Sequence, residues 1–464
     1  MGKKFNQSGS NQTIILNTLS TAILQGITFL TLPFFTRLLG TSQYGIFSLF
    51  NSWVSILICI MGLNIYSSIG AGFYEFKEKY TDFRNSNLLL TTIIGGVQLA
   101  LIVIFSREIS NLISLNQILV ILIGIAAFGH YIILFSQCAF IYEKKPLNNF
   151  VLSIAYSVLS TGLSFILILF VKNENRYLAR SFGVAISYMF IALLVWIYLF
   201  REKPTGIKKK YSEFGIRVGM PIIFHALSLN ILNQSDRVMM QMYGYDASYI
   251  GIYSLFYTFS SVLTVLLSAL NNSWCPFYYE YLNSEKWDAL KKKVGNYIEL
   301  FTILSIGFLL LSKEVLFIIA DKSYWSGINV LPILVIIVYF TFMYQFPVNF
   351  EFFHKKTKII AIGTIIAGIL NIILNSIMIP KWNMYGAAIA TGLSYLSLFF
   401  VHYFIVKHMN YHLKVKDFYP GLVVLSIGCL AFYILSPFWY LRWAIGIILG
   451  CYEVNKFFKR KSIF

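Results

Sequence analysis

The chain has 464 residues, of which 58% are apolar, 17% aromatic and only 12% charged, and its formal net charge at pH 7 is +18. A soluble domain carries about 25% charged residues, so this composition excludes a water-soluble globular protein. A membrane-spanning helix needs about 20 mostly apolar residues. Fourteen such helices would use most of the chain and leave no room for a folded extramembrane domain.

The first half of the chain contains six apolar stretches that are bounded by charged or turn-forming residues and are long enough to span a membrane. They are residues 13–39, 44–69, 88–105, 117–142, 150–171 and 178–200. The residues before the first stretch are too polar for a cleaved signal peptide, so we expect this helix to be retained.

Six more stretches follow the basic segment 201–217, and a weaker pair follows the polar segment 407–416. They are residues 218–243, 249–274, 297–311, 330–347, 359–379 and 384–406, then 419–435 and 441–452. The sequence therefore predicts an all-α integral membrane protein with about fourteen transmembrane helices.

The distribution of basic residues predicts the orientation of these helices. Cytoplasmic loops of membrane proteins are rich in Lys and Arg. With a cytoplasmic N-terminus, 27 of the 37 Lys and Arg residues fall on the inner side. We therefore expect both termini and the segment 201–217 to be cytoplasmic, with Lys208, Lys209 and Lys210 as a topological anchor. Because this bias explains the net charge, nucleic-acid binding is not expected.

An internal repeat divides the chain. The motif Gly45-Ile46-Phe47-Ser48-Leu49-Phe50 recurs 206 residues later as Gly251-Ile252-Tyr253-Ser254-Leu255-Phe256. Three further pairs of short matching motifs occur in the same order, at offsets of 203 to 211 residues. A duplicated six-helix unit would place two lobes about a pseudo-twofold axis along the membrane normal. We predict a six-helix lobe at 1–205, a second at 206–410, and an additional helix pair at 411–464.

Motifs of catalysis, nucleotide binding and metal binding are missing from the sequence. The only G-x-G is Gly70-Ala71-Gly72, which lacks the rest of a dinucleotide or P-loop pattern. The five cysteines have no C-x-x-C spacing. We therefore expect a protein that is not an enzyme and has no metal or cofactor. Any energy that it needs would come from an ion gradient or from consumption of its substrate on the outer side of the membrane.

Two motifs resemble those of the polysaccharide-synthesis flippases. They are Leu32-Pro33-Phe34-Phe35-Thr36-Arg37-Leu38-Leu39-Gly40 followed by Tyr44-Gly45, and Ser235-Asp236-Arg237 followed by Gly251-Ile252-Tyr253-Ser254. This family shares a superfamily with multidrug and toxin extrusion pumps and lipid II flippases. The resemblance implies a flippase that moves an undecaprenyl-diphosphate-linked oligosaccharide across the bacterial cytoplasmic membrane. The oligosaccharide would be the repeat unit of a lipopolysaccharide O-antigen or of a capsule.

Polar residues inside the apolar stretches are the candidates for substrate contact, since Arg or Asp at a helix centre costs about 2.5 to 3.5 kcal/mol on insertion scales. Asp236 and Arg237 lie in the seventh stretch with Asn233 and His225, and Arg37 lies near the end of the first. Arg237 could line the lumen and bind the diphosphate through its forked donors, or hold helices together. For Arg37 a snorkelling side chain is favoured, and for His225, as for His130, a hydrogen-bonded core histidine is favoured over a proton carrier.

Two glutamates occupy equivalent places in the repeat. Glu75 and Glu280 are predicted to close the inner ends of their helices, where they could form gating ion pairs with Lys144-Lys145 and Lys355-Lys356. The alternative is that all of these are solvated loop charges. A structure with both Glu side chains far from any Lys would favour this alternative.

Other kinds of transporter and enzyme remain as alternatives. An ion-coupled exporter of cationic drugs should have an acidic lumen. A lipid II-type flippase would carry a related lipid-linked substrate. A membrane-bound O-antigen polymerase should have a large external loop, which this sequence lacks. The partners expected from the resemblance are the lipid-linked glycan, membrane lipids and a polysaccharide polymerase. The identity of a coupling ion, a proton or sodium, is left open.

Overall fold

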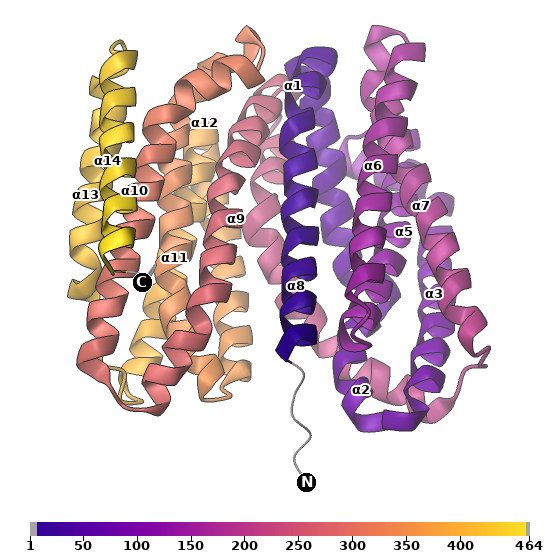
Figure 1. Ribbon diagram of the computed structural model, residues 1–464. Helices are drawn as coiled ribbons and strands as arrows, with labels where there is room; N and C mark the ends of the chain where they lie inside the picture. Colours follow the sequence, from indigo (N-terminus) through magenta and orange to yellow (C-terminus); the bar gives the residue numbers. More distant parts are fainter. Residues whose placement is uncertain (1–6, 461–464) are drawn as a thin grey trace. The chain divides into compact units, whose positions relative to one another are not determined.

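A computed structural model describes residues 7–460; the side chains of residues 7–22, 24, 457 and 460, together with the two chain ends, fall outside the description. In the described residues every regular element is a helix (Figure 1). The prediction of an all-α membrane protein is therefore confirmed. Lys3, Lys4 and Lys461, which contributed to the predicted orientation, lie outside the described residues.

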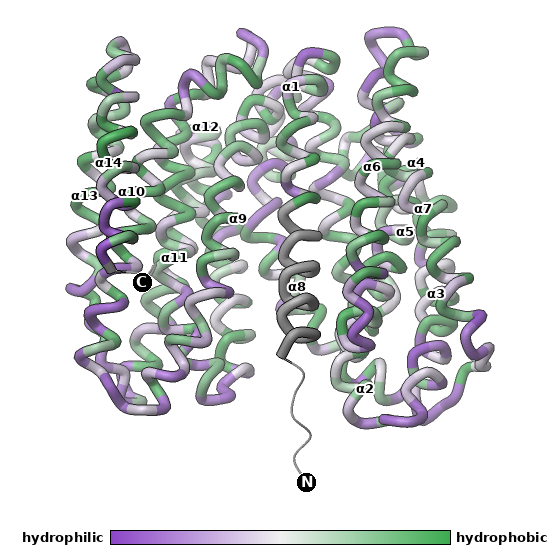
Figure 2. Tube along the Cα trace, viewed as in Figure 1, coloured by the Kyte–Doolittle hydropathy of each residue, from purple (hydrophilic) through white to green (hydrophobic). Residues whose placement is uncertain are grey.

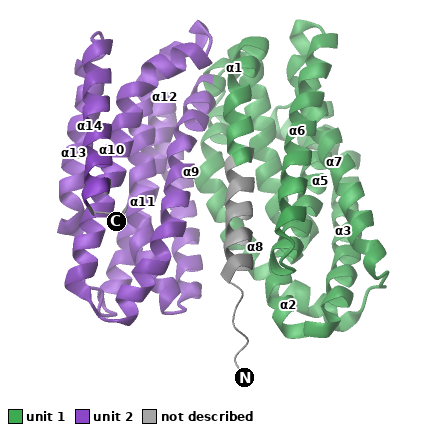
Figure 3. Ribbon diagram, in the orientation of Figure 1, with its two compact units in different colours: residues 1–251 green, residues 252–464 purple. Residues whose placement is uncertain are grey.

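The helices form two compact units, residues 1–251 and 252–464 (Figure 3). The first unit contains α1 (Gln7–Ile60), η1 (Met61–Ser68), α2 (Ile69–Phe76), α3 (Tyr80–Ile104), α4 (Ser106–Ile113), α5 (Gln117–Tyr142), α6 (Pro146–Phe170), α7 (Arg176–Glu202), α8 (Lys209–Met242) and the start of α9. The second contains the rest of α9 (Ala247–Asn283), α10 (Trp287–Ile319), η4 (Lys322–Val330), α11 (Leu331–Phe353), α12 (Thr357–Lys407), α13 (Tyr419–Ile434) and α14 (Trp439–Arg460).

Two of the longest helices are each interrupted once. The backbone of α1 leaves the helical conformation at Gly40 (φ 64°, ψ 179°), and that of α12 does so at Asn383 (φ 55°, ψ −133°). Positive φ is open to glycine and tolerated by asparagine. With α1 and α12 each divided in two, and the eight-residue α2 and α4 left out, the described residues form fourteen helices, as predicted. The boundaries of the predicted lobes stay a prediction.

Ten described segments are long and apolar enough to cross a membrane, and the first of them, Gln25–Ile104, includes more than one helix. Large apolar side chains lie on the outside of the helices, among them Leu30, which is 71% exposed, and Phe170, which is 84% exposed. Figure 2 shows hydrophobic residues along the helices of each unit and hydrophilic ones gathered near the connections between them. The chain is a multi-pass membrane protein whose apolar side chains face lipid.

The second predicted apolar stretch, 44–69, does not form one continuous helix. Helix α1 ends at Ile60, and Gly62, Leu63 and Asn64 then form a left-handed turn with φ of 52°, 54° and 55°. Left-handed backbone costs about 1–2 kcal/mol for each residue with a Cβ. Gln98 of α3 compensates the break, because its Oε1 accepts the Gly62 N–H at 2.9 Å and its Nε2 donates to Ile60 O at 3.0 Å. Apolar periodicity carries no signal for such a turn.

Close helix packing in the first unit depends on glycines. A Cβ on Gly45 of α1 would overlap the carbonyl oxygen of Ala247 and lie 2.9 Å from the Gly251 nitrogen. The two glycines that begin the repeated motif therefore contact each other within this unit. Small residues allow helix backbones to approach in this way inside membranes.

A network of charged side chains closes one end of the first unit. Arg84 at the start of α3 is fully buried and pairs with Glu143 and, at 2.8 Å, with Glu202. Lys145 Nζ lies 2.7 Å from Glu143 Oε2. Burial alone would lower the pKa of Lys145, but the hydrogen bond to Glu143 and the charges of Glu143 and Glu202 raise it above its usual value. The network joins the ends of α3, α5 and α7.

The connection between α7 and α8 is attached to the same end of α3. Lys203 Nζ lies 2.8 Å from Asp82 Oδ1, Lys208 Nζ lies 3.7 Å from Asp82 Oδ2, and the Lys208 N–H donates to Ser86 Oγ at 2.9 Å. Thr205 is buried against Asp82. Lys208, predicted as a simple topological anchor, therefore also holds this connection in place.

Candidate functional site: a polar cavity in the first unit

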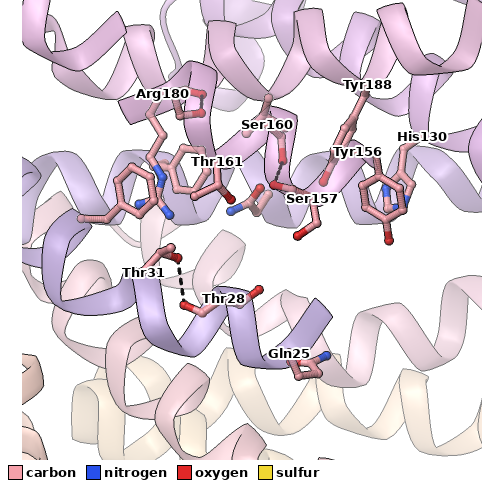
Figure 4. A pocket seen from close by; sticks show the side chains of 15 residues that line it. Gln25, Thr28, Thr31, His130, Tyr156, Ser157, Ser160, Thr161, Arg180 and Tyr188 are labelled. Atoms are coloured by element: carbon pink, nitrogen blue, oxygen red, sulfur yellow. Dashed lines mark hydrogen bonds between the residues drawn. The ribbon is translucent and has the colours of Figure 1, made fainter. Parts of the chain in front are cut away.

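A cavity of about 350 Å³ lies within the first unit, between α1, α5, α6 and α7 (Figure 4). Its walls combine hydroxyl, amide and aromatic side chains with one guanidinium. The lining residues are Gln25, Thr28, Thr31, Phe35, Phe47, Asn51, His130, Tyr156, Ser157, Ser160, Thr161, Ser164, Arg180, Val184 and Tyr188. A polar cavity among apolar helices is the natural candidate for a site that binds a polar ligand.

Contacts between α1 and the beginning of α7 position the cavity. The side chain of Gln43 donates to Asn173 O and accepts the Tyr177 N–H at 3.0 Å, so it satisfies one of the free amides at the start of α7. Arg176 Nη1 donates to Leu38 O at 2.9 Å. Leu38 lies just before the break in α1 at Gly40, where carbonyl groups lose their helical partners. These bonds fix the end of α7 that carries Arg180.

Helices α6 and α7 approach each other closely along the cavity wall. A Cβ on Gly183 would lie 2.5 Å from the Cα of Ser164, so only glycine fits there without a shift of the backbone. The Ser164 hydroxyl donates to Arg180 O at 3.0 Å. This contact fixes where Arg180 lies along the axis of α6, relative to the row of hydroxyls on that helix.

Arg180 lies at one end of the cavity, against two aromatic rings of α1. Its guanidinium carbon is 3.7 Å from the ring centre of Phe35 and 3.8 Å from that of Phe47. Such cation–π contacts contribute about 0.5 to 2 kcal/mol each, depending on desolvation. They stabilise the charge of Arg180 away from bulk water.

Three aromatic side chains form the other end of the cavity. The ring centres of His130 and Tyr188 are 4.8 Å apart, those of Tyr156 and Tyr188 are 5.7 Å apart with an interplanar angle of 85°, and those of His130 and Tyr156 are 5.8 Å apart. Figure 4 shows them at the end opposite Arg180. We refer to His130, Tyr156 and Tyr188 as the aromatic wall.

Hydroxyl groups line the space between these ends. Thr28 and Thr31 of α1 face Ser157, Ser160 and Thr161 of α6 (Figure 4). Thr31 Oγ1 donates to Ile27 O at 2.8 Å, and Ser160 Oγ donates to Ser157 O at 3.1 Å. A hydroxyl that donates to its own helix keeps oxygen lone pairs to accept a hydrogen bond from a ligand.

The cavity has no acidic lining residue. Asp and Glu are missing from the lining set, and the chain has no acidic residue before Glu75. With Arg180 as a cationic side chain of the lining, the electrostatic character favours neutral polar or anionic ligands and opposes cations.

Two of the polar residues predicted to bind substrate lie in α8 and are buried. Asp236 is fully buried and Arg237 is 4% exposed. Arg237 Nη1 donates to Asn233 O at 2.9 Å and to Gln234 Oε1 at 3.0 Å, and Ser52 of α1 donates to the same Gln234 oxygen at 3.0 Å. Asn233 Nδ2 donates to Leu229 O at 2.8 Å. Arg237 thus joins a chain of hydrogen bonds between α8 and α1, and its role toward substrate stays a prediction.

The other predicted site residues are separate from the cavity. Arg37 of α1 is exposed, and His225 of α8 is half-buried. Glu75 at the end of α2 and Glu280 in α9 are exposed, and among the described residues neither forms an ion pair. The gating role of the two glutamates stays a prediction. Among the described residues, His, Cys, Asp and Glu nowhere form a group of three or more that could hold a metal ion.

Sequence reasoning missed Arg180 and the cavity around it, although the sequence contains a signal for them. Ser157, Ser160, Thr161 and Ser164 recur at the spacing i, i+3, i+4 and i+7, which places four hydroxyls on one face of a helix. Arg180 is the third residue of the predicted stretch 178–200. A polar face on one apolar stretch and a charge inside the next together indicate a polar cavity between neighbouring helices.

The helical fold and its apolar helices define a polytopic membrane protein. Among solved structures, the fold resembles that of the lipid II flippase MurJ with a TM-score of 0.70 and 18% identity, over 94% of this chain and 99% of MurJ. It also resembles the multidrug transporter DinF-BH, of the MATE type, with a TM-score of 0.63 and 14% identity, over 90% of this chain and 98% of that one.

The chain belongs to the family of polysaccharide biosynthesis proteins, whose profile matches residues 10–281. A protein of the Lsg locus of Haemophilus influenzae is 23% identical over 356 residues, which are 74% of this chain and 85% of that protein. The predicted family is thereby confirmed.

Proposed function

We propose that the protein is a flippase that moves undecaprenyl-diphosphate-linked oligosaccharides, such as O-antigen or capsule repeat units, from the inner to the outer leaflet of the bacterial cytoplasmic membrane by alternating access. The observation that carries this proposal is the hydroxyl-lined cavity without acidic residues in the first unit. Membership in a polysaccharide biosynthesis family supports the same substrate class.

A lipid-linked sugar needs hydrogen-bonding partners while it crosses the membrane. Burial of a hydroxyl without a partner costs about 1–3 kcal/mol by protein mutational data, and an oligosaccharide has many hydroxyls. The side chains of Asn51, Thr28, Ser157 and Thr161 can replace the water that each sugar hydroxyl loses. We infer that the cavity lowers the barrier for the headgroup in this way, without any covalent step.

The competing function within the superfamily is export of cationic drugs. Such a site would be expected to carry carboxylates, and this cavity presents Arg180 instead. A lipid II-type flippase moves a related lipid-linked sugar, so the cavity fits both glycan functions. The family profile favours a polysaccharide precursor.

The buried residues of α8 belong to the same proposal. We propose that Arg237, with Asp236 and Asn233 beside it in α8, contributes to binding the diphosphate of the carrier. His225, about three turns earlier in the same helix, is proposed to line the lumen, and Arg37 to act at the membrane interface. Arg237 and Asp236 are buried in a membrane-spanning helix, where a charge is costly without a ligand or partner. We further propose that Glu75 and Glu280 act in gating, through ion pairs with Lys144-Lys145 and Lys355-Lys356 that form in another state of the transport cycle.

The experiment is transport by the purified full-length protein in liposomes. The vesicles contain a lipid-linked oligosaccharide, and a membrane-impermeant glycosidase on one side measures how fast the glycan appears there. We expect faster exposure with the protein than in protein-free vesicles, and no uptake of a cationic dye. Movement of lipid II but not of longer oligosaccharides would favour the lipid II function. Dye transport without glycan transport would show the proposal to be wrong.

A further inference from the structure

We propose that the cavity of the first unit is a binding site for a negatively charged sugar residue, a sugar that carries a carboxylate or a phosphate, with the acidic group at Arg180 and the sugar ring at the aromatic wall. This inference rests on the proposed function and specifies it, because it predicts that the protein prefers acidic glycans.

The surroundings of Arg180 favour an oxyanion as its ligand. The five N–H donors of a guanidinium lie in its plane, so packing of the group against Phe35 and Phe47 at 3.7 and 3.8 Å does not use them up. The same packing restrains the orientation of the side chain. A carboxylate or phosphate matches the spacing of two parallel N–H donors, which a hydroxyl group does not.

The aromatic wall suits the other part of such a ligand. A sugar ring presents C–H groups on its faces and hydroxyls on its edge. Tyr156 and Tyr188, set at 85° to each other, offer an apolar ring face together with phenolic groups that can donate or accept hydrogen bonds. The row of hydroxyls on α6 lies between this wall and Arg180, along the edge of a ring placed there (Figure 4).

The size and polarity of the cavity limit what it can hold. A volume of about 350 Å³ is near the lower end of the usual range of ligand sites, about 300–1,000 Å³. This space suits a sugar unit and is too small for a whole lipid-linked oligosaccharide. The diphosphate of the carrier is the other source of an oxyanion, but it is attached to an apolar chain, whereas polar side chains surround this cavity. The structure therefore favours an acidic sugar over the diphosphate.

The test compares two glycolipids on the same undecaprenyl-diphosphate carrier, one with a hexuronate and one with the matching neutral hexose. A charged hydrogen bond contributes about 1.5–3 kcal/mol, which corresponds to roughly a 10- to 150-fold change. We expect Arg180→Gln to slow transport of the acidic glycolipid by at least about 10-fold and that of the neutral one by less than about twofold, and Arg180→Lys to recover part of the loss.

Lys172→Gln is the matched control, because Lys172 is an exposed basic residue just before α7 that does not line the cavity. It should leave both rates unchanged. Transport of the neutral glycolipid also shows that Arg180→Gln has folded. Equal loss for both glycolipids would overturn the proposal and assign Arg180 to the carrier diphosphate or to the fold, and undiminished transport of the acidic one would overturn it too.

A binding measurement keeps this inference separate from the proposed function. Calorimetry with the purified protein compares methyl glucuronide with methyl glucoside. We expect tighter binding of the glucuronide, and loss of this preference in Arg180→Gln. If the wild-type protein moves neither glycolipid, the proposed function is wrong, while a glucuronide preference that depends on Arg180 still supports the site. The absence of any preference in the wild type would overturn the inference itself.

Discussion

Removal of the Arg84 side chain should destabilise the first unit more than loss of any exposed ion pair. The Arg84 side chain is 1% exposed and its partner Glu143 is 9% exposed, whereas its second partner Glu202 is 45% exposed. Arg84→Ala therefore leaves one carboxylate buried and one at the surface. Leu199 O, which accepts from Arg84 at 3.0 Å, keeps a second donor in Asn85 at 3.1 Å.

The size of the effect follows from these contacts. Truncation of one partner of a buried ion pair costs about 3–5 kcal/mol, because a buried charge is left uncompensated. Glu202 can hydrate and adds at most about 1 kcal/mol. Lys145 Nζ still lies 2.7 Å from Glu143 and is 35% exposed, so it compensates part of the loss. We expect a destabilisation of about 3 kcal/mol.

Thermal unfolding of the purified protein in detergent, followed by tryptophan fluorescence, measures this effect. For a unit of roughly 250 residues, 1 kcal/mol shifts Tm by about 2–4 °C, so Arg84→Ala should lower Tm by roughly 6–12 °C. Lys203→Ala is the control. Lys203 is 55% exposed and pairs with Asp82 at 2.8 Å, so its loss should cost less than about 1 kcal/mol.

A double variant separates charge from packing. Arg84→Met with Glu143→Gln removes the buried carboxylate together with its partner, and it should recover most of the stability lost in Arg84→Met alone. If Arg84→Ala lowers Tm no more than Lys203→Ala does, or if the double variant recovers nothing, the assignment of Arg84 as the centre of the network is wrong.

Three further predictions test orientation, packing and the diphosphate site. Gly206→Cys in a cysteine-free background should react with an impermeant thiol reagent in inverted vesicles but not in intact cells. Position 206 is suitable because a Cβ there faces open space. Thr205 is buried, so a cysteine in its place would be unreactive on either side. Labelling in intact cells would reverse the predicted topology. Gly45→Ala should lower the stability of the protein by about 1–3 kcal/mol, because the added methyl group overlaps a neighbouring backbone. Gly26→Ala on the same helix is the control: a Cβ there has nothing within 4 Å, so the change should be neutral or slightly stabilising. Equal effects of the two substitutions would contradict the close contact at Gly45. Arg237→Ala should abolish glycan export at normal membrane abundance, with partial activity in Arg237→Lys, and wild-type export by Arg237→Ala would refute its substrate role.

The sequence was sufficient to predict the helices of this protein because their apolar length is a direct requirement of the bilayer. The matching motifs that begin at Gly45 and Gly251 predict a duplication, which stays a prediction; in the structure the backbones of these two glycines lie in close contact. The breaks at Gly40 and Asn383 fall in the gaps between predicted stretches, so the apolar pattern located both of them. The left-handed turn at Gly62–Asn64 was harder to predict, because it lies inside the apolar stretch 44–69.

The candidate site was less predictable than the helices, for a physical reason. Charges deep in an apolar stretch give the clearest sequence signal of function, and this signal points to Asp236 and Arg237, whereas Arg180 lies one turn from the start of α7. Its position against Phe35 and Phe47 depends on how α7 packs on α1. Tertiary contacts of this kind leave no periodic pattern in a single sequence.

The left-handed turn after α1 has a consequence for how the protein is built into the membrane. Its backbone groups lose their intrahelical partners at Gly62 and Ile60 and regain them from Gln98, which lies 36 residues later along the chain than Gly62. An unsatisfied backbone group is costly in lipid. The second half of α1 therefore reaches its final form only after α3 has been synthesised and has entered the bilayer. We expect these two segments to leave the translocation machinery as a pair. The side chain of Gln98 would then determine the order in which these helices assemble.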